Sequence, residues 1–447
     1  MAGNPCRTIM PSRTKHTPAE GSPYQPYYSA NIKSLLRNSA AGGSAGSGAL
    51  PYPAIGIYCG PGASHSWLWF VDMLEAMGFL NIAFINEREI QAGGLSRYDA
   101  LLISGGDTFA IAGALGEAGA RELTRFLRGG GIYIGSCAGA YLPLNSSLSP
   151  LNLFNYVSAK ISNLARNLPA PAVLPEKFCT PYGCRYVFHP VREEVIMHII
   201  DFPSRIQQYT EVTAPLYGGP AFLTPGDART VALYRGFTPQ TLYLADPQLA
   251  HDTLVGRAAI IAKPVGAGTM YLSGPHLEHP RYPPANTLIA EMLYGSGKEH
   301  GDTAACTRPE GETCSSGTRD RLLRNIRSEL SNSRIAALAL ERTPLQWQIG
   351  RKVYEPEKIS LFLEAMWSRW DIFASQKSGH EHELYAIYDL AKEVTRLVRC
   401  IQQSTASGTD DPAAAEELFE RLKVLTASFL TIYCDVRKSR IIHGGAT

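Results

Sequence analysis

The sequence has 447 residues, of which 45% are hydrophobic and 18% are charged, and its formal net charge is +2. The balanced charge gives no indication of nucleic acid or an acidic membrane surface as a partner. No apolar run reaches the roughly 18 residues that a transmembrane helix needs. The length suffices for two or three domains with sizeable cores.

The cysteines indicate the environment of the chain. There are nine, an odd number scattered over the whole sequence, which does not fit a disulfide framework. None forms the short Cys-x2-Cys pair of a zinc site. We therefore expect a reducing, cytoplasmic environment, no bound metal and no cofactor.

Residues 1–52 are expected to be a disordered leader and linker. They are rich in Ser, Pro, Gly, Ala and Tyr, and the run at 40–48 has the composition of a flexible linker. Organelle targeting is an alternative, suggested by five basic residues against the single acidic Glu20: Arg7, Arg13, Lys15, Lys33 and Arg37. No clear amphipathic helix supports targeting.

Residues 53–297 alternate between strand and helix patterns. The first apolar run, 54–59, ends in Gly60-Pro61-Gly62 and precedes a helical pattern at 67–77. Further strands are predicted at 81–85, 100–103 and 132–134, with a long helix at 108–128. This order predicts an α/β fold, a three-layer sandwich whose mostly parallel sheet is covered on both faces. The loops at the carboxyl ends of its strands are expected to meet at one edge: 60–65, 104–108 and 135–141.

The second part of this domain is less regular. Residues 145–210 are expected to form an insertion or cap. Strand patterns then return with a more antiparallel character, at 221–223, 229–235, 241–244, 257–263 and 268–273.

A polar linker at 298–318 is expected to lead into a helical bundle at 319–447. Four helices are predicted there, at 319–341, 356–376, 382–403 and 412–435. The last one begins with Asp411 as N-cap and Pro412 at the first helical position. Short connections favour an antiparallel bundle, in which we expect the aromatic residues Trp367, Trp370 and Phe373 to pack. This bundle is also the candidate surface for a protein partner.

The pentapeptide Gly135-Ser136-Cys137-Ala138-Gly139 has the spacing of a nucleophile elbow, with cysteine at the position of the usual serine. Small residues on both sides permit the sharp strand-to-helix turn that exposes the sulfur. The N-terminus of the following helix is expected to favour the thiolate. Taken alone, the motif fits a buried, inert thiol equally well.

His276 and Glu278 decide between these interpretations. They follow the last predicted strand of the α/β region, so we expect them at the same edge as Cys137. A nucleophilic cysteine needs an imidazole to take its proton, and that imidazole needs a carboxylate to hold it in the correct tautomer.

These motifs resemble the class I glutamine amidotransferase-like fold, and more narrowly the domain at the N-terminus of some biotin–protein ligases. The resemblance covers about 53–296 and is carried by Gly56–Ser64, Ser104–Asp107, Gly131–Tyr141, Tyr217–Phe222 and Leu272–Glu278. It implies a catalytic triad, with Cys137 as nucleophile, His276 as general base and acid, and Glu278 as its orienting carboxylate. It also implies an oxyanion hole formed by the backbone amides of Gly106 and Ala138.

The sequence departs from the family pattern in several places. Leu277 occupies the position where amidotransferases usually carry proline. We find neither an acceptor domain with a phosphate loop nor the Gly- and Arg-rich loop of a biotin ligase. Ala138 stands where the related peptidase and chaperone branch usually has histidine.

Other polar and glycine residues of the edge loops are candidates for contact with substrate: Gly60, Gly62, Ser64, Gly105, Asp107, Tyr141, Gly218 and Gly219. Ordinary loop residues are the alternative for these. His65 is a weaker candidate of the same kind, and four further histidines are interpreted as structural: His189, His198, His251 and His279.

The expected function is that of a cysteine-dependent amide hydrolase or amidotransferase-type enzyme, which acts on a small-molecule amide through a thioester intermediate. The alternative is a non-catalytic ligand-binding or regulatory module that keeps the pocket without turnover.

Overall fold

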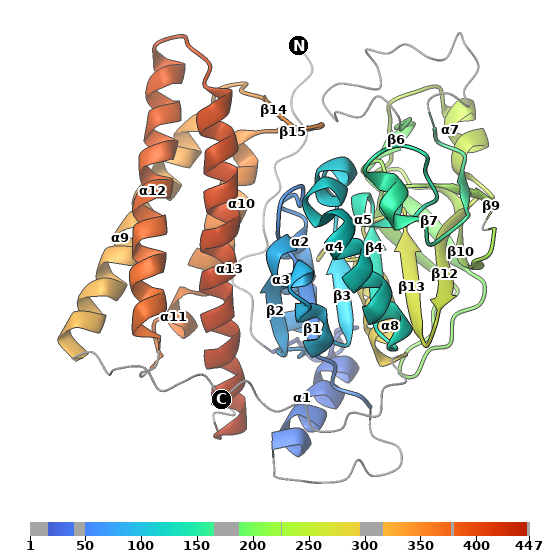
Figure 1. Ribbon diagram of the computed structural model, residues 1–447, viewed down its shortest axis with the longest axis horizontal. Helices are drawn as coiled ribbons and strands as arrows, with labels where there is room; N and C mark the ends of the chain where they lie inside the picture. The colour runs from blue at the N-terminus through green and yellow to red at the C-terminus, as the bar shows by residue number, and fades with distance from the viewer. Residues whose placement is uncertain are drawn as a thin grey trace.

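The computed structural model describes residues 17–39, 50–164, 187–224, 226–295, 316–376 and 380–444. Figure 1 shows an α/β domain beside a C-terminal group of long helices, with the N-terminal helix below. Among the described residues, no helix combines the length and apolar character needed to cross a membrane.

The central sheet has the strand order β2-β1-β3-β4-β13-β12-β10-β7-β8. Its first five strands run parallel: β1 (Ile55–Tyr58), β2 (Ile82–Ile85), β3 (Ala100–Ile103), β4 (Ile132–Ser136) and β13 (Gly268–Ser273). The remaining four continue it in antiparallel fashion: β12 (Ala258–Val265), β10 (Arg229–Phe237), β7 (Glu194–Ile199) and β8 (Glu211–Pro215). Every residue of β1, β3 and β4 is buried, as the apolar runs predicted.

The strand order explains the layers. From β1 the chain moves outward to β2, and from β3 it moves in the opposite direction to β4. Right-handed crossovers therefore place α2 (Trp67–Ala76) and α4 (Thr108–Arg128) on opposite faces. The short α3 (Glu87–Gln91) contacts α4, and α8 (Pro283–Tyr294) contacts α2. The three-layer α/β prediction is confirmed. The strand order reverses between β1 and β3, and sheets of this kind bind ligands at such a point.

Small strands complete this domain. They are β5 (Lys160–Ile161), which pairs with β9 (Phe222–Thr224) beside β12, and β6 (Val191–Arg192), which pairs with β11 (Leu242–Tyr243). Helix α7 (Pro247–Leu254) precedes β12.

The C-terminal helices are α9 (Ser316–Leu340), α10 (Pro356–Trp367), α11 (Trp370–Phe373), α12 (Glu381–Ala406) and α13 (Pro412–Ile442). The helix predicted at 356–376 is divided in two between Trp367 and Trp370. The Asp411 side chain caps α13 as expected, since it accepts the Ala414 N–H at 3.0 Å. Trp370 and Phe373 are buried in the core, whereas Trp367 is half-buried under the guanidinium of Arg334.

The sequence did not predict a β-hairpin between α9 and α10. It consists of β14 (Trp347–Ile349) and β15 (Lys352–Tyr354). Figure 1 shows it extending from the helical domain toward the α/β domain.

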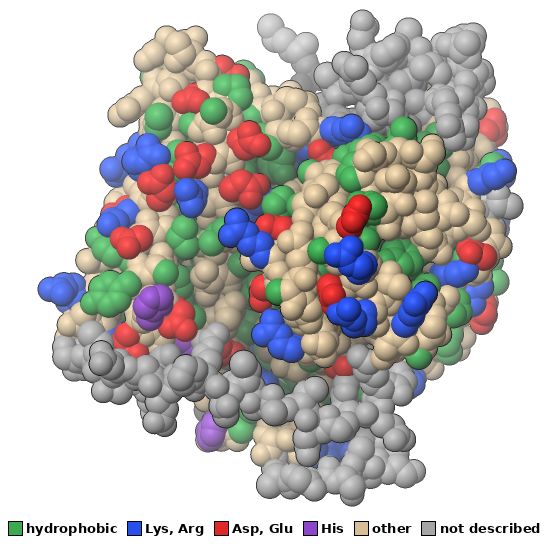
Figure 2. Space-filling model, viewed as in Figure 1, with side chains coloured by type: hydrophobic (Ala, Val, Ile, Leu, Met, Phe, Trp, Pro, Cys, Tyr) green, Lys and Arg blue, Asp and Glu red, His purple; other side chains and the backbone are tan. Residues whose placement is uncertain are grey.

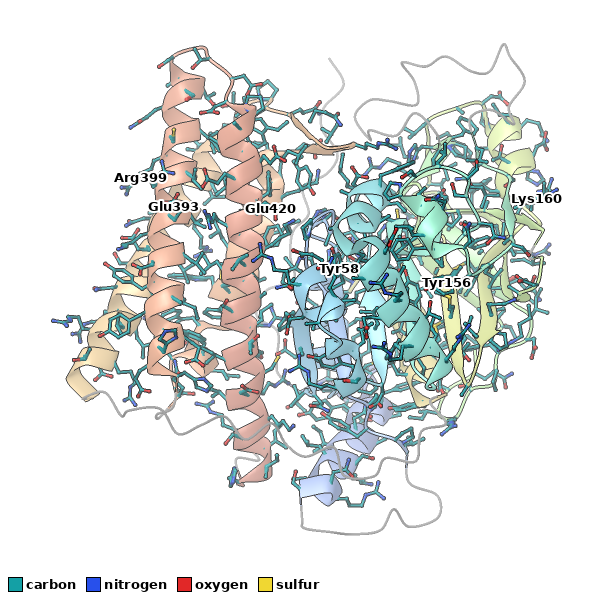
Figure 3. The ribbon with its side chains drawn as sticks, in the orientation of Figure 1. Tyr58, Tyr156, Lys160, Glu393, Arg399 and Glu420 are labelled. Carbon is teal, nitrogen blue, oxygen red and sulfur yellow. The ribbon has the colours of Figure 1, made fainter. Side chains whose placement is uncertain are left out.

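A buried ion-pair network joins the two domains. Arg369, which is 2% exposed, lies 2.6 Å from both Asp72 Oδ1 and Glu75 Oε2 of α2. The other oxygen of Glu75 contacts Tyr433 and Arg437 of α13. Helix α13 also packs along the edge strand β2. Figure 3 labels Tyr58 of β1 and Glu420 of α13 on the two sides of this boundary.

The expectation of a disordered leader does not hold for residues 25–39, which form helix α1 (Gln25–Ser39). Tyr27 is fully buried and donates a hydrogen bond to Glu291 Oε1 at 2.7 Å. Asn31 donates to the Met77 carbonyl and accepts from Tyr294. The composition of the leader did not predict these contacts, because only a few residues of α1 are buried and they are separated in the sequence. The linker run at 40–48 and residues 298–315 of the second linker lie outside the described residues.

Candidate active site

The turn after β4 holds Cys137 in a strained backbone conformation, with φ 52° and ψ −107°. A Cβ on Gly135 would lie 2.3 Å from the Gly139 carbonyl oxygen, and one on Gly139 would lie 2.0 Å from that of Ile103. Only glycine therefore fits at either place, which is the physical basis of the predicted elbow spacing. The helix that follows, α5 (Ala138–Tyr141), has only four residues, so its dipole contributes less to the thiolate than the sequence suggested.

His276 and Glu278 lie in the loop after β13, next to this turn. The His276 N–H donates to the Pro215 carbonyl at 2.8 Å, and its Nδ1 lies 2.7 Å from Glu278 Oε1. His276 is 3% exposed and Glu278 is fully buried. The parallel pairing of β4 with β13 sets Ser136 opposite Ser273, and the Cys137 N–H donates to the Ser273 carbonyl.

Burial by itself would raise the pKa of the Cys137 thiol. A hydrogen bond with His276 and the positive charges of His276 and Lys352 outweigh burial, so the pKa of Cys137 lies below its ordinary value. Burial opposes the charged imidazole too, but the Glu278 charge and hydrogen bonds to Cys137 and Glu278 raise the pKa of His276 to about 9. Both shifts favour the thiolate–imidazolium pair over the neutral thiol and imidazole.

The loop after β3 approaches this pair closely. A Cβ on Gly105 would lie 2.8 Å from His276 Cε1, and one on Gly106 would lie 2.0 Å from the Gly62 carbonyl oxygen. The Gly139 N–H donates a hydrogen bond to the Ser104 carbonyl. In the described part of the chain, the N–H groups of Gly106 and Ala138 donate to no other residue.

Two of the candidate residues before α2 hold this loop in place, and a third contacts the C-terminal domain. The Ser64 hydroxyl donates to the Gly105 carbonyl at 2.9 Å, and the Gly62 carbonyl accepts the Asp107 N–H at 2.8 Å. The Gly60 carbonyl accepts a hydrogen bond from Lys423 of α13.

Asp107 has both carboxylate oxygens in use. Oδ1 accepts the N–H groups of Phe109 and Ala110 and so caps α4, while Oδ2 accepts the N–H of Arg351 at 2.7 Å. The Arg351 guanidinium lies 3.4 Å from the centre of the Phe109 ring. The β14–β15 hairpin is thus fastened to the loop that carries Gly105 and Gly106.

The remaining candidates, Tyr141, Gly218 and Gly219, are joined by hydrogen bonds. The Tyr141 hydroxyl donates to the Gly218 carbonyl at 3.2 Å, and Asn163 Nδ2 donates to the Tyr141 hydroxyl and the Gly219 carbonyl. A Cβ on Gly218 would lie 1.9 Å from His189 Cε1, so this glycine leaves the room that the imidazole occupies.

The sequence interpretation missed an aromatic and histidine cluster around His276. The ring of Trp69 lies 5.3 Å from the rings of both His276 and His65, and 4.4 Å from that of His279. The Tyr217 ring lies 5.5 Å from that of His276. Burial and nearby positive charge lower the pKa of His65 far below its usual value and that of His279 to about 3. Trp69 lies in the first turn of α2, directly after the candidate loop at 60–65. This position could have identified Trp69 as a residue of the site.

Two of the histidines interpreted as structural, His189 and His279, therefore lie near the candidate site. Burial, followed by the charges of Arg192 and Lys352, lowers the pKa of His189 to about 3. His189 is 6% exposed, and neither ring nitrogen has a hydrogen-bond partner in the described part of the chain.

Lys352 was missed because it belongs to the C-terminal domain. It lies on β15, one residue after the clamped Arg351, and its positive charge acts on Cys137, His65 and His189. No local pattern in the sequence relates position 352 to the elbow.

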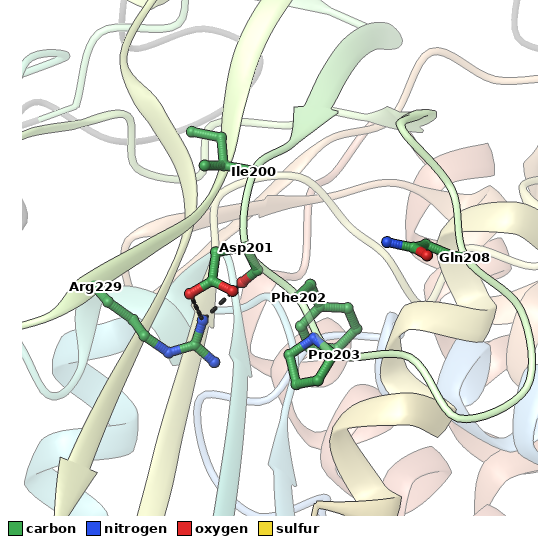
Figure 4. A pocket seen from close by; sticks show the side chains of 6 residues that line it. All are labelled: Ile200, Asp201, Phe202, Pro203, Gln208 and Arg229. Atoms are coloured by element: carbon green, nitrogen blue, oxygen red, sulfur yellow. Dashed lines mark hydrogen bonds and ion pairs between the residues drawn. The ribbon is translucent and has the colours of Figure 1, made fainter.

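The described residues contain no cluster of three or more His, Cys, Asp or Glu side chains that could hold a metal ion. A shallow surface pocket of about 430 Å³ lies away from the candidate site, beside the start of β10. Figure 4 shows that Arg229 and Asp201 pair across it, at 3.2 Å. None of its lining residues belongs to the loops around Cys137.

Comparisons of structures find likenesses with low scores. A beta-galactosidase from Bacillus circulans sp. alkalophilus matches 55% of this chain at 13% identity and a TM-score of 0.31. A beta-galactosidase from Rahnella sp. R3 matches 54% at 10% identity and a TM-score of 0.29. This chain spans 31% of the length of each enzyme. A cytoplasmic protein from Salmonella typhimurium LT2 is covered over 100% of its length, at 12% identity and a TM-score of 0.31.

At TM-scores this low, none of these likenesses bears on activity. No curated protein matches the sequence significantly. Residues 54–146 match the family described as biotin-protein ligase, N terminal. The matched segment includes Gly105, Gly106 and Cys137, and it ends before His276. The predicted resemblance is therefore confirmed: the segment that carries the elbow is similar to the N-terminal domain of biotin–protein ligases.

Proposed function

We propose that this chain is a cysteine-dependent amide hydrolase or amidotransferase-type enzyme that acts on a small-molecule amide. One observation carries the proposal, namely that the strained Cys137 at the end of β4 lies beside the loop after β13, where His276 Nδ1 is 2.7 Å from the buried Glu278 Oε1. Strained nucleophiles, an imidazole and a buried carboxylate in this order are typical of acyl-transfer enzymes.

In the proposed reaction, the Cys137 thiolate attacks the amide carbonyl carbon. The carbonyl π electrons move to oxygen, and the Gly106 and Ala138 N–H groups donate to this oxyanion. The tetrahedral intermediate collapses to a thioester, and the C–N bond breaks as the His276 imidazolium gives its proton to the leaving amine. Neutral His276 then takes a proton from water, whose oxygen attacks the thioester and releases the acid and the thiolate.

Each group has a role that its environment supports. The lowered pKa of Cys137 favours the nucleophilic thiolate, and the raised pKa of His276 supplies an acid for the amine. Glu278 accepts from Nδ1, which leaves Nε2 of His276 for Cys137 and for the leaving group. A cytoplasmic location would suit this chemistry, since a reducing environment keeps the thiol free.

The test is the reactivity of Cys137 followed by turnover. We expect iodoacetamide to label Cys137 much faster than Cys59, Cys400 or Cys434, all of which are free thiols. In a screen of small amides by mass spectrometry, His276→Ala should lower turnover by about 100-fold or more, and Cys137→Ser should abolish thioester formation. The control is His198→Ala, because His198 is exposed on β7.

A Cys137 that reacts like an ordinary thiol, at a rate unchanged by His276→Ala, would overturn the enzyme proposal. A reactive Cys137 without turnover of any amide would favour the non-catalytic binding module instead.

A further inference from the structure

The surroundings of Cys137 carry positive charges beyond that of His276. Lys352 and Arg192 act on His189, and Lys358 lies among the same charges. Burial and the neighbouring Lys352 lower the pKa of Lys358 to about 8, against the opposing charge of Glu355. Such crowding of cations destabilises the protein unless an anion offsets it.

The positions of these groups follow from their contacts with the loops around Cys137. The Arg192 guanidinium lies 4.9 Å from the Tyr217 ring centre, and Tyr217 lies beside His276. Gly218, the next residue, abuts His189. On the opposite side, the Arg351 N–H bond to Asp107 fixes the residue before Lys352 against the Gly105–Gly106 loop.

One member of this group is buried and unsatisfied, and another is half-buried without a partner. The half-buried Lys352 has no ion pair or hydrogen bond in the described part of the chain. His189 is more than nine-tenths buried, and both ring nitrogens lack partners among the described residues. A buried polar group without a partner costs free energy, which a ligand that pairs with it would recover.

We propose that His189, Arg192 and Lys352 form an anion subsite beside Cys137, and that the substrate is an amide bearing an anionic group. The inference rests on the proposed function, and it deepens it by naming the substrate class. Lys352 provides the charge, and neutral His189 offers one N–H donor. The C-terminal domain thereby supplies a specificity-determining residue for a nucleophile in the other domain.

The experiment compares two alkylating reagents of similar size at Cys137. Iodoacetate carries a negative charge and iodoacetamide is neutral, so the ratio of their rates reports the local field independently of thiol reactivity. We expect this ratio at Cys137 to exceed that of N-acetylcysteine by about tenfold. Lys352→Gln should lower it severalfold, and Lys352→Arg should keep it high.

Lys392→Gln is the matched control, since Lys392 is an exposed lysine of α12 that pairs with Asp389. Its ratio should equal that of the unchanged protein. An unchanged ratio in Lys352→Gln, or a ratio in the unchanged protein equal to that of N-acetylcysteine, overturns the subsite. Slow labelling by iodoacetamide would instead refute the proposed function, so the two failures are distinguishable.

Competing anions identify the chemistry of the bound group. Inorganic phosphate and acetate are tested separately for protection of Cys137 against iodoacetate. Protection by phosphate assigns a phosphorylated substrate, and protection by acetate assigns a carboxylate. The same protection should be weaker in His189→Phe, which removes the ring nitrogens; protection by neither anion contradicts the subsite.

Discussion

The Asp107 carboxylate accepts the backbone N–H of Arg351 at 2.7 Å, although the two residues are 244 positions apart in the chain. The same carboxylate caps α4. One side chain therefore holds both the helix that follows the Gly105–Gly106 loop and the hairpin that carries Lys352. The two domains meet at the candidate site as well as at the ion-pair network of Arg369.

The two roles of Asp107 can be separated by substitution. Asparagine keeps an oxygen for the cap but turns an N–H donor toward the Arg351 N–H, so Asp107→Asn should lower the free energy of unfolding by about 1–2 kcal/mol. Asp107→Ala loses the cap as well and should cost about 1 kcal/mol more. Urea unfolding measures both, and faster amide hydrogen exchange at 347–354 should report release of the hairpin.

The control for Asp107→Ala is Asp246→Ala, because Asp246 caps α7 by accepting the N–H groups of Gln248 and Leu249. It should cost only the cap, about 1 kcal/mol. Equal costs at the two positions, with unchanged exchange in the hairpin, would show that the Arg351 bond contributes nothing.

The titration of Cys137 should depend on His276. In the unchanged protein the imidazolium stabilises the thiolate, so the thiolate should form at a pH below the ordinary range of a thiol. In His276→Ala burial is no longer opposed by that charge, so the midpoint should move upward. The difference in ultraviolet thiolate absorbance between the protein and its Cys137→Ser variant measures the midpoint. A midpoint that is the same with and without His276 contradicts the proposed pair.

Turnover should also fall on the alkaline side. The leaving amine needs the protonated form of His276, which is lost as the pH rises through about 9. Glu278→Gln removes the charge that raises this pKa most, so the alkaline limb should move to lower pH. The measurement is the pH profile of hydrolysis of an amide found in the screen, and a limb that stays in place would argue against Glu278 as the partner of His276.

The elbow glycines should tolerate no side chain. Gly139→Ala would place a Cβ 2.0 Å from the Ile103 carbonyl, and we expect a loss of about 3 kcal/mol in the free energy of unfolding. Gly236→Ala is the control, because a Cβ at that strand position meets nothing within 4 Å. Denaturant unfolding of both variants tests this, and equal stability would show that the elbow can relax.

The Arg369 network should be a major element of the domain boundary. Arg369→Met leaves Glu75 and Asp72 without this cation, and we expect a loss of about 3–5 kcal/mol. Arg396→Met removes an exposed helix-surface pair with Glu393 and should leave the unfolding transition nearly unchanged. Thermal unfolding compares them, and a small effect of Arg369→Met would mean that α13 packing alone holds the domains.

The charges on the outer face have a different character from this buried network. Figure 2 shows basic and acidic side chains interspersed on the helical domain, with no large region of one sign on that face. Several ion pairs on this domain join residues one helical turn apart, as Arg421 and Glu417 do.

Much of the α/β domain could be predicted because its signals are local. Apolar runs of four or five residues marked β1, β3 and β4, and the helix predicted at 382–403 became α12. Helix α1 was missed because Tyr27 and Asn31 make their contacts with residues more than 40 positions away. The β14–β15 hairpin was missed because its strands have three residues each and leave no strong pattern.

The sequence by itself determined the elbow, since Gly135, Cys137 and Gly139 act through sterics within one turn, and it determined the pairing of His276 with Glu278, two residues apart. Only the tertiary structure decided that His189 and Lys352 lie near Cys137 and His276. Packing of α13 against β2 and the Asp107–Arg351 bond bring the hairpin to the sheet edge. Electrostatic neighbours of this kind depend on how separate elements dock, which no local spacing of residues encodes.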